Sequence, residues 1–282
     1  MGLHEFYSIQ SKGYIMKKAI MTLLGIAVLV MPFSSFAGSC GDVDNSGSIN
    51  ILDVTHLISY LYNDGPEPDC GETTGTVTDI DGNVYLTVTI GTQVWMAENL
   101  KVTHYRNGDP IPHITEGVYW WDLTSGAYCE YNNDSDNVAT YGRLYNWYAV
   151  DDSRNIAPEG WHVPTDEEWK QLEMYLGMSQ AQADSTLVRG TDEGGKLKET
   201  GTTHWASPNT GATNESGFTA LPCGYRGNSG IYKSMGHNAY FWSSTENSGL
   251  NVWYRLLTNY YSEVYRYYYG KKDGFSIRCV KD

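Results

Sequence analysis

The stretch GWHVPTDEEW, Gly160 to Trp169, contains the clearest helix start in the chain. Thr165 and Glu168 stand three positions apart and form a capping box, in which each side chain accepts a hydrogen bond from the other residue's backbone N–H. Acidic residues in the first turn complement the helix dipole. Gly177 suits the position just beyond the last turn. The sequence therefore predicts a helix here, with a buried stripe made of Trp169, Leu172 and Leu176.

A second capping box follows this helix. Ser179 and Gln182 repeat the same spacing, which predicts a second helix running toward Arg189. Beyond it, the segment from Gly194 to Gly236 is rich in Gly, Thr, Asn and Ser. Their side chains hold turns by hydrogen bonding to the backbone, so we expect ordered but irregular structure in this segment.

Upstream, the stretch TVTDIDGNVYLTVTI, Thr76 to Ile90, predicts a β-hairpin. Apolar residues alternate on both sides of Asp81-Gly82, a dipeptide that favours a tight turn. Because side chains alternate across a strand, one face is expected to carry Val84, Leu86, Val88 and Ile90.

Longer motifs connect these elements from Thr76 to Asp282: QVWMAENL, YGRLYNWYAV, GWHVPTDEEW, GGKLKETGTTHW, NTGATNESGFTALP, FWSSTE and KKDGFSIRCVKD. With these motifs, residues 76–282 resemble the Fibrobacter succinogenes major paralogous domain family. That family is similar in turn to the formylglycine-generating enzyme and C-type-lectin-like folds. The resemblance implies an α+β domain with two helices, short twisted antiparallel strands and long loops, and it implies no established activity.

The resemblance does not extend to catalysis. Formylglycine-generating enzymes use two cysteines that lie near each other in the C-terminal part of the chain, whereas Cys129, Cys223 and Cys279 are far apart in this sequence. The family's common Cys before GWHVP is Ala157 here. Cys279 therefore lacks the partner that the resemblance implies, and Cys223 is a candidate replacement.

The stretch GDVDNSGSINILD, Gly41 to Asp53, has the ligand spacing of an EF-hand loop. Ca²⁺ takes six to eight oxygen ligands, and alternating side chains around a Gly at the sharp turn supply them. The predicted ligands are Asp42, Asp44, Ser46, the Ser48 carbonyl, Asn50 and Asp53. Asp at the last position and Val43 in place of an entering helix are features of type I dockerin repeats. Residues 38–70 resemble one such repeat, followed by a linker at 71–75.

The calcium loop leads into a predicted amphipathic helix at 51–62, whose apolar residues are Val54, Leu57, Ile58 and Leu61. Dockerins usually pair two repeats, so this single stripe needs another cover: the large domain, a second copy or a cohesin-like partner. Cys40 and Cys70 bracket the module. In a secreted protein they are expected to form a disulfide worth about 3–4 kcal/mol, because it closes a loop in the unfolded chain.

The N-terminus has the composition of a secretory signal. Lys17 and Lys18 precede the apolar run Ala19–Met31, and Ala37 ends a small-residue cleavage pattern, so residues 1–37 are predicted to be removed. Translation starts at Met1 or at Met16. A lipoprotein modified at Cys40 is the alternative. The apolar run is too short for a membrane span, and we expect a secreted or cell-surface protein without a transmembrane segment.

Charge and histidine spacing narrow the classes of function. The net charge of −14 disfavours nucleic acid, which needs a basic surface. Five histidines, His104, His113, His162, His204 and His237, lack metal-ligand spacing and are interpreted as hydrogen-bonded loop or packing residues. No glycosidase carboxylate pair can be assigned from spacing alone. The YNND run at 131–134 is interpreted as a turn.

Aromatic residues provide the remaining signal. Trp120-Trp121, residues 145–148 and Trp253-Tyr254 are expected to be mostly buried. The segment TNYYSEVYRYYYGKK, Thr258 to Lys272, mixes Tyr with Asn, Ser and Arg, as adaptable binding surfaces do. If it is a strand, alternation splits the predicted ligand residues into two sets: Tyr265, Tyr267 and Tyr269 on one face, and Arg266 and Tyr268 on the other.

Three hypotheses follow. The favoured one is a non-catalytic recognition or adhesion protein, attached through the dockerin-like repeat and binding a glycan or protein ligand with its lectin-like domain. The second is an enzyme or accessory of extracellular polysaccharide degradation. The third is a structural surface protein without a small ligand.

Overall fold

The computed structural model describes residues 75–282 and, upstream of them, Ile51, Val54, Thr55, Ile58 and Ser59. Those five residues are helical, as predicted for 51–62. The signal region lies outside the described residues. So do the predicted disulfide and calcium ligands: Cys40, Cys70, Asp42, Asp44, Ser46, Ser48, Asn50 and Asp53.

Residues 75–282 form a mixed α+β domain. Its strands are β1 (Gly75–Thr78), β2 (Val84–Ile90), β3 (Gln93–Met96), β4 (Tyr128–Cys129), β5 (Leu144–Tyr145), β6 (Trp161–His162), β7 (Leu187–Arg189), β8 (Cys223–Arg226), β9 (Tyr232–Met235), β10 (Asn238–Ser248), β11 (Asn251–Thr258), β12 (Val264–Gly270) and β13 (Val280–Lys281). Its helices are α3 (Gly117–Trp121), α4 (Val138–Tyr141), α5 (Trp147–Val150), α6 (Asp166–Tyr175), α7 (Gln180–Asp184) and α8 (Glu193–Leu197), with 3₁₀ turns η1 (Tyr131–Asn133) and η2 (Ser135–Asn137).

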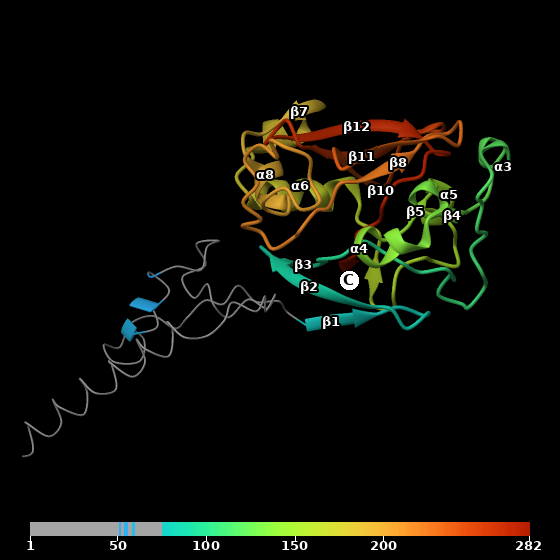
Figure 1. The fold of residues 1–282 in the computed structure, drawn as a ribbon, viewed down its shortest axis with the longest axis horizontal. Coiled ribbons are helices and arrows are strands. Elements are labelled where there is room, and N and C mark those ends of the chain that lie inside the picture. Colours follow the sequence, from blue (N-terminus) through green and yellow to red (C-terminus); the bar gives the residue numbers. More distant parts are fainter. Residues whose placement is uncertain (1–50, 52–53, 56–57, 60–74) are drawn as a thin grey trace, which may run out of the picture. The chain divides into compact units, whose positions relative to one another are not determined.

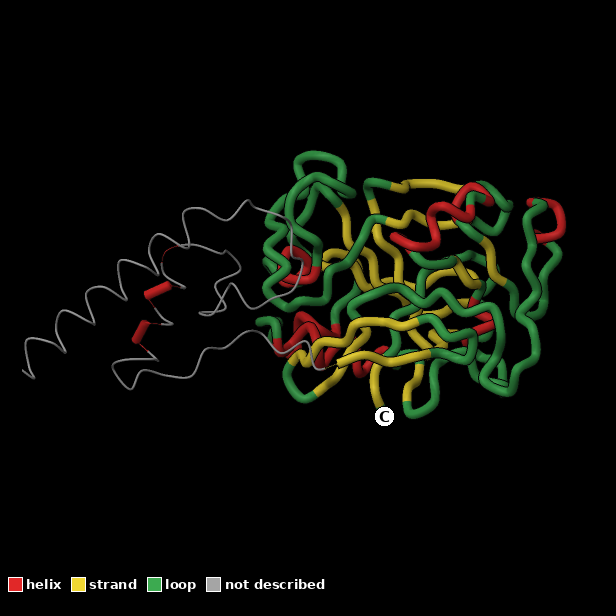
Figure 2. Tube along the Cα trace, turned by 60° about the horizontal axis from the view of Figure 1, so that its bottom comes forward, coloured by secondary structure: helices red, strands yellow, loops and turns green. Residues whose placement is uncertain are grey.

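Two larger sheets organise this domain. The first has the order β1-β2-β3-β13-β6, so the last strand of the chain pairs between early ones. The second has the order β7-β12-β11-β10-β8-β9 and contains the long hairpin β10–β11. Figure 1 shows β10, β11 and β12 side by side in one part of the domain and β1 to β3 in another. Loops run around the strands (Figure 2).

The predicted helix starts are confirmed. The Thr165 hydroxyl accepts a hydrogen bond from the Glu168 N–H, and the Glu168 carboxylate accepts one from the Thr165 N–H at 2.7 Å. The second box, at Ser179, is also present. Gly177 adopts φ +132° directly after α6, and the predicted stripe of Trp169, Leu172 and Leu176 is buried.

The second helix is shorter than predicted. It ends at Asp184, because Leu187–Arg189 leaves the helix to pair with β12, with Arg189 opposite Val264. Arg189 then reaches the Glu173 carboxylate at 2.8 Å. A buried ion pair and a strand partner thus override the local helical preference.

The β1–β2 hairpin forms as predicted, but the face that carries Val84, Leu86, Val88 and Ile90 is only partly buried. Val84 and Leu86 are exposed, whereas Tyr85 is fully buried. The Tyr85 hydroxyl donates to Asp79 at 2.6 Å and accepts from the Lys101 N–H at 2.8 Å, which holds the ring inside. The predicted set is buried only at Val88 and Ile90.

Helix α6 covers one face of the second sheet through a network of buried charges. Asp166 binds Arg255 at 2.8 Å and Arg266 at 2.6 Å. Glu173, about two turns further along the same face of the helix, binds Arg255 at 2.6 Å as well as Arg189. Each carboxylate therefore has two guanidinium partners, which compensates for its removal from water.

The cysteine prediction for this domain is wrong. Cys129, Cys223 and Cys279 are all free and buried, so Cys223 does not replace the missing partner of Cys279. Instead the sulfur of Cys223 lies 3.0 Å from the Ser276 hydroxyl. Burial raises the pKa of all three thiols.

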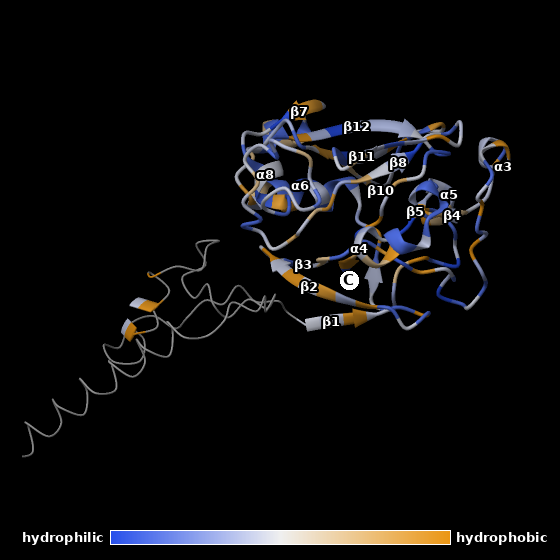
Figure 3. Ribbon diagram, in the orientation of Figure 1, coloured by the Kyte–Doolittle hydropathy of each residue, from blue (hydrophilic) through white to orange (hydrophobic). Residues whose placement is uncertain are grey.

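The aromatic prediction is confirmed for most of its residues, but Tyr148 and Trp253 are only half-buried. Trp120, Trp147 and Tyr254 are buried, but Trp121 is exposed on the short helix α3. Trp120 stacks on the Arg226 guanidinium at 4.5 Å, which leaves its neighbour pointing outward. Figure 3 shows apolar residues on α3 and on the edge strand β7, whereas the tip of β12 is pale, as tyrosine is of intermediate hydropathy.

Candidate ligand-binding face

The backbone of strand β12 alternates as predicted, but the rings of Tyr267 and Tyr268 stack on each other, with centroids 4.3 Å apart. Arg266 is 6% exposed, points to the α6 side with Asp166, and stacks on Trp253 at 3.7 Å. Tyr268 lies on that side too, 5.8 Å from Trp253. Because its guanidinium is bound to Asp166, Arg266 belongs to the packing under α6 and not to an open ligand surface.

The opposite face of β12 carries the other predicted set. Tyr269 is 37% exposed, and Tyr265 and Tyr267 are half-buried. In the β11–β12 register Tyr267 pairs with Tyr254, so both lie on the same side of the sheet. This side, which we call the tyrosine face, is only partly covered.

Four tyrosines from four strands form a closed ring on this face. They are Tyr225 of β8, Tyr240 of β10, Tyr254 of β11 and Tyr269 of β12. Successive ring centroids are 4.7, 5.9, 5.8 and 6.5 Å apart around the circuit. Phe275 is fully buried, and its centroid lies 4.9 to 5.8 Å from all four. The tyrosine ring is therefore a packed aromatic platform with Phe275 as its floor.

The ring depends on contacts between distant segments. Strand β8 runs parallel to β10, with Gly224 opposite Ala239, which places Tyr225 beside Tyr240. Gly224 has φ +62°, and a Cβ there would lie 2.4 Å from the Lys233 carbonyl oxygen. Only glycine allows β8 to approach β9 this closely.

The phenol groups of the tyrosine ring stay neutral. Burial is the main cause that raises the pKa of Tyr225, Tyr240, Tyr254 and Tyr269. The Tyr225 and Tyr269 hydroxyls hydrogen-bond to each other, and Tyr240 accepts from the Asn238 amide at 3.1 Å. A neutral hydroxyl both donates and accepts, so the ring suits a neutral polar ligand.

Beside the Tyr225–Tyr269 pair lies an incompletely bonded carboxyl group. Asp273 is 2% exposed, and its Oδ1 accepts from the Asn228 N–H at 2.8 Å. Its Oδ2 has no hydrogen-bond partner in the described part of the chain. Burial raises the pKa of Asp273 to about 7, against the smaller opposing effects of that hydrogen bond and of Lys233.

Comparison with protein families matches residues 88–281 to the Fibrobacter succinogenes major domain. The chain belongs to this family. Comparisons with curated proteins and with solved structures gave no match. The tyrosine face lies within the family domain, because β8, β10, β11 and β12 all fall inside the matched residues.

In the family domain, the tyrosine face continues onto the β11–β12 turn. Tyr260 and Tyr261 are exposed there, and the Tyr261 ring lies 6.1 Å from that of Tyr265. The buried Lys198 fixes this turn. Its ammonium donates to three carbonyls at 2.9 Å: those of Thr210, Thr258 and Tyr261. Burial lowers the pKa of Lys198 to about 8.

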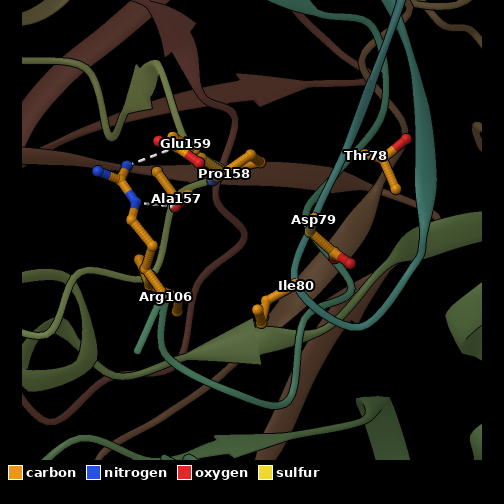
Figure 4. Close-up of a pocket in the computed structure, with 8 residues that line it drawn as sticks. Thr78, Asp79, Ile80, Arg106, Ala157, Pro158 and Glu159 are labelled. Atoms are coloured by element: carbon orange, nitrogen blue, oxygen red, sulfur yellow. Dashed lines mark hydrogen bonds between the residues drawn. The ribbon is translucent and has the colours of Figure 1, made fainter. Parts of the chain in front are cut away.

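The domain also has a small pocket of about 220 Å³ on the other sheet, beside the end of β1 (Figure 4). Asp79 and Glu159 both line it. Asp79 accepts from the Asn83 N–H at 2.9 Å and from Tyr85 at 2.6 Å, and Arg106 donates to the Ala157 carbonyl at 3.0 Å. These side chains serve the turns around the pocket, and no aromatic ring lines it.

All five histidines of the domain were predicted to be hydrogen-bonded loop or packing residues, and the side chains of four of them are hydrogen-bonded. His104, His113, His162 and His204 contact the carboxylates of Asp81, Glu130, Glu168 and Glu199. The YNND run is a 3₁₀ turn with Asn132 at φ 57°. Within the described residues, no His, Cys, Asp and Glu side chains gather in a metal-binding group. None of the described helices has the length and apolarity needed to cross a membrane.

Sequence reasoning identified one strand of the tyrosine face and missed its other three. Tyr254 was interpreted as packing, whereas Tyr225 and Tyr240 were given no role. A partial signal exists in the alternation of β10 and β11, where Tyr240 and Tyr254 fall on one face. The contribution of β8 has no local signal.

Proposed function

We propose that this protein is a secreted or cell-surface recognition and adhesion protein without catalytic activity. Its family domain, of the lectin-like fold type that the resemblance implies, binds a ligand through the tyrosine face. The observation that carries the proposal is the tyrosine ring, in which Tyr269 is exposed, Tyr225 and Tyr240 are half-buried and Tyr254 is buried, together with the half-buried Tyr265 and Tyr267. Such rings bring large contact area at low entropy cost and present hydroxyls to polar partners.

A neutral glycan is the ligand class that this surface suits best. Sugar rings stack their C–H faces on aromatic rings and exchange hydrogen bonds with neutral hydroxyls. A protein loop is the other ligand class, and a binding screen that includes both distinguishes them.

Attachment is assigned to the N-terminal module. In this proposal Ca²⁺ orders the loop from Asp42 to Asp53, the Cys40–Cys70 disulfide closes the module, and the helix after the loop binds a cohesin-like protein. Calorimetric titration of the full chain tests the metal site. We expect one binding event that disappears in Asp42→Ala with Asp53→Ala, and a variant that binds calcium as wild type does would refute the assignment.

Two observations favour recognition over the other hypotheses. A polysaccharide-degrading enzyme needs two available carboxylates in a cleft beside exposed aromatics, whereas Asp79 in the pocket is occupied by its own turn. A purely structural role would bury the tyrosines of β12, yet Tyr269 is 37% exposed. A recognition role requires no free carboxylate pair and uses exposed tyrosines, so it fits both observations.

The test is a glycan and cell-surface binding screen of the full chain, with calcium and with a chelator. Tyr269→Ala is expected to weaken binding about tenfold, since one well-placed ring contributes more than about 1 kcal/mol to an interface. The matched control is Tyr175→Ala, because Tyr175 is 66% exposed but lies on α6, away from the tyrosine face. Equal losses in the two variants, or no binding to any glycan or cell surface, would argue against the proposal.

A further inference from the structure

We propose that Tyr260 and Tyr261 form a second binding subsite for a neutral oligosaccharide, and that Lys198 positions them. This inference rests on the proposed function and deepens it, because it requires the glycan to be an extended chain. The two tyrosines lie in the turn between β11 and β12, where Tyr260 is 62% exposed and Tyr261 is 47% exposed. Both are more exposed than Tyr269 of the tyrosine ring, so their rings are open to a ligand.

The second subsite lies at the end of the six-stranded sheet where β12 begins. Figure 1 shows β7 and α8 at this end. The Tyr261 ring lies 6.1 Å from the ring of the half-buried Tyr265. Tyr265 pairs with the exposed Val188 of β7, so these two side chains share one side of the sheet. Two phenol rings and an aliphatic side chain therefore form an apolar surface that also presents hydroxyls.

The charges around this surface favour a neutral ligand. Burial, followed by the charges of Tyr261 and Glu263, raises the pKa of Tyr265, so its hydroxyl stays neutral. The Glu263 carboxylate would repel an anionic ligand. Lys198 does not offset that repulsion at the surface, because its side chain is fully buried.

The backbone that carries the two tyrosines is fixed before any ligand binds. The ammonium of Lys198 has three N–H donors, and all three are used at 2.9 Å, on the carbonyls of Thr210, Thr258 and Tyr261. The Thr258 hydroxyl accepts from the N–H groups of Tyr260 and Tyr261 at 3.2 Å. Both backbone polar groups of Tyr261 are therefore bonded within the protein. A turn fixed in this way loses little conformational entropy on binding, which favours affinity.

A ligand that occupies both subsites must be long. Tyr265 and Tyr269 lie four residues apart on β12, which corresponds to about 14 Å along a strand. Tyr269 belongs to the tyrosine ring, whereas Tyr265 contacts Tyr261. A short oligosaccharide therefore reaches only one subsite, and a longer one reaches both.

The experiment measures how the affinity of the full chain depends on ligand length. The probes are neutral oligosaccharides of glucose, mannose and galactose, from disaccharide to octasaccharide. For wild type we expect affinity to rise about tenfold along a series that binds. Tyr260→Ala with Tyr261→Ala should remove this rise and leave disaccharide binding unchanged, whereas Tyr269→Ala should weaken binding at every length. The matched control is Tyr119→Ala, because Tyr119 is 65% exposed but lies on α3, and it should behave as wild type.

The role of Lys198 is tested by its dependence on the two tyrosines. Lys198→Met removes the three donors and should weaken octasaccharide binding about fivefold without affecting the disaccharide. Added to the double tyrosine variant, it should cause no further loss, because a positioning residue acts only through the residues that it positions. Thr258→Val removes the hydroxyl that accepts from Tyr260 and Tyr261, and it should give the same pattern if Lys198→Met does not fold.

Two results would overturn the second subsite while the proposed function stands. In the first, Tyr269→Ala weakens binding but the double tyrosine variant binds every length as wild type does. In the second, the double variant weakens short and long chains equally, which would mean that it disturbs the fold. Octasaccharide binding that is unchanged in both Lys198→Met and Thr258→Val would refute the positioning role. If no member of any series binds wild type, the subsite is overturned together with the glycan ligand.

Discussion

The two faces of the six-stranded sheet bury different kinds of polar group: one buries paired charges, and the other buries neutral hydroxyls. Under α6, Arg255 and Arg266 meet Asp166 and Glu173, and each carboxylate has two partners. On the tyrosine face, neutral hydroxyls take the place of charges, and the one carboxyl, Asp273, has an oxygen without a partner. The same strands supply both faces, since Arg266 alternates with Tyr265 and Tyr267. The charged network under α6 fixes the structure of that face, whereas the tyrosine face keeps partly exposed rings.

The largest expected effect comes from breaking the paired face. Arg255→Ala removes one guanidinium from both Asp166 and Glu173 and leaves buried carboxylates underpaired. We expect a loss of about 3–5 kcal/mol in the free energy of unfolding, measured by urea denaturation. The control is Glu246→Gln, which breaks the more exposed pair with Lys271 and should cost less than about 1 kcal/mol. A similar small cost for Arg255→Ala would show that the network contributes little.

The second prediction concerns the unpaired face in the absence of ligand. Burial raises the pKa of Asp273 from 3.8 to about 7 in the folded domain. Its protonated form is favoured by folding, so this contribution is present below pH 4 and is lost as pH rises to about 7. Asp273→Asn removes this pH-dependent loss of stability, because the Asn side chain does not ionise. Relative to wild type, the variant should gain about 2–4 kcal/mol of stability between pH 4 and pH 8. A difference that does not change with pH would mean that Asp273 is not desolvated.

The features of the two faces that could be predicted from the sequence are those set by residues close together in the chain. The capping boxes at Thr165 and Ser179, the hairpin at Asp81-Gly82 and the alternation of β12 are set by neighbouring residues, and all formed as predicted. They fix α6 and one strand of the tyrosine face.

The remaining features depend on long-range contacts that no sequence period encodes. Tyr225 joins the ring because β8 runs parallel to β10. Tyr85 is buried because Asp79 and Lys101 bind its hydroxyl, while Val84 and Leu86 on either side of it are exposed. The helix expected to run to Arg189 gave way to β7 because β12 offered a partner. In each case a tertiary contact outweighed the local pattern.

The third prediction tests the paired face at acid pH. Burial raises the pKa of Asp166, but the hydrogen bond from Arg266 and the charge of Arg255 outweigh this and lower it to about 2. Asp166 therefore stabilises the fold above pH 4, and the contribution is lost as pH falls toward 2. We expect about 2 kcal/mol of pH-dependent stability over this range in wild type. It should be absent from Asp166→Asn, and an unchanged acid profile in that variant would count against the pairing.

The smallest expected effect on stability, and the one that separates the two faces most clearly, comes from the tyrosines of β12. Tyr265, Tyr267 and Tyr269 are partly exposed, so replacing all three with Ala should leave the melting temperature close to that of wild type while glycan affinity falls at least tenfold. Replacing Arg266 and Tyr268 should do the reverse. Arg266 binds Asp166 beneath α6, and its loss lowers the melting temperature with less effect on binding. Thermal melts and binding assays on the two variants give a melting temperature and a glycan affinity for each.

If both variants lose their stability, β12 is core on both sides and the ligand face lies elsewhere. If neither set affects binding, the tyrosine face is a surface without a ligand, because the same rings that carry the proposal would then contribute nothing to recognition.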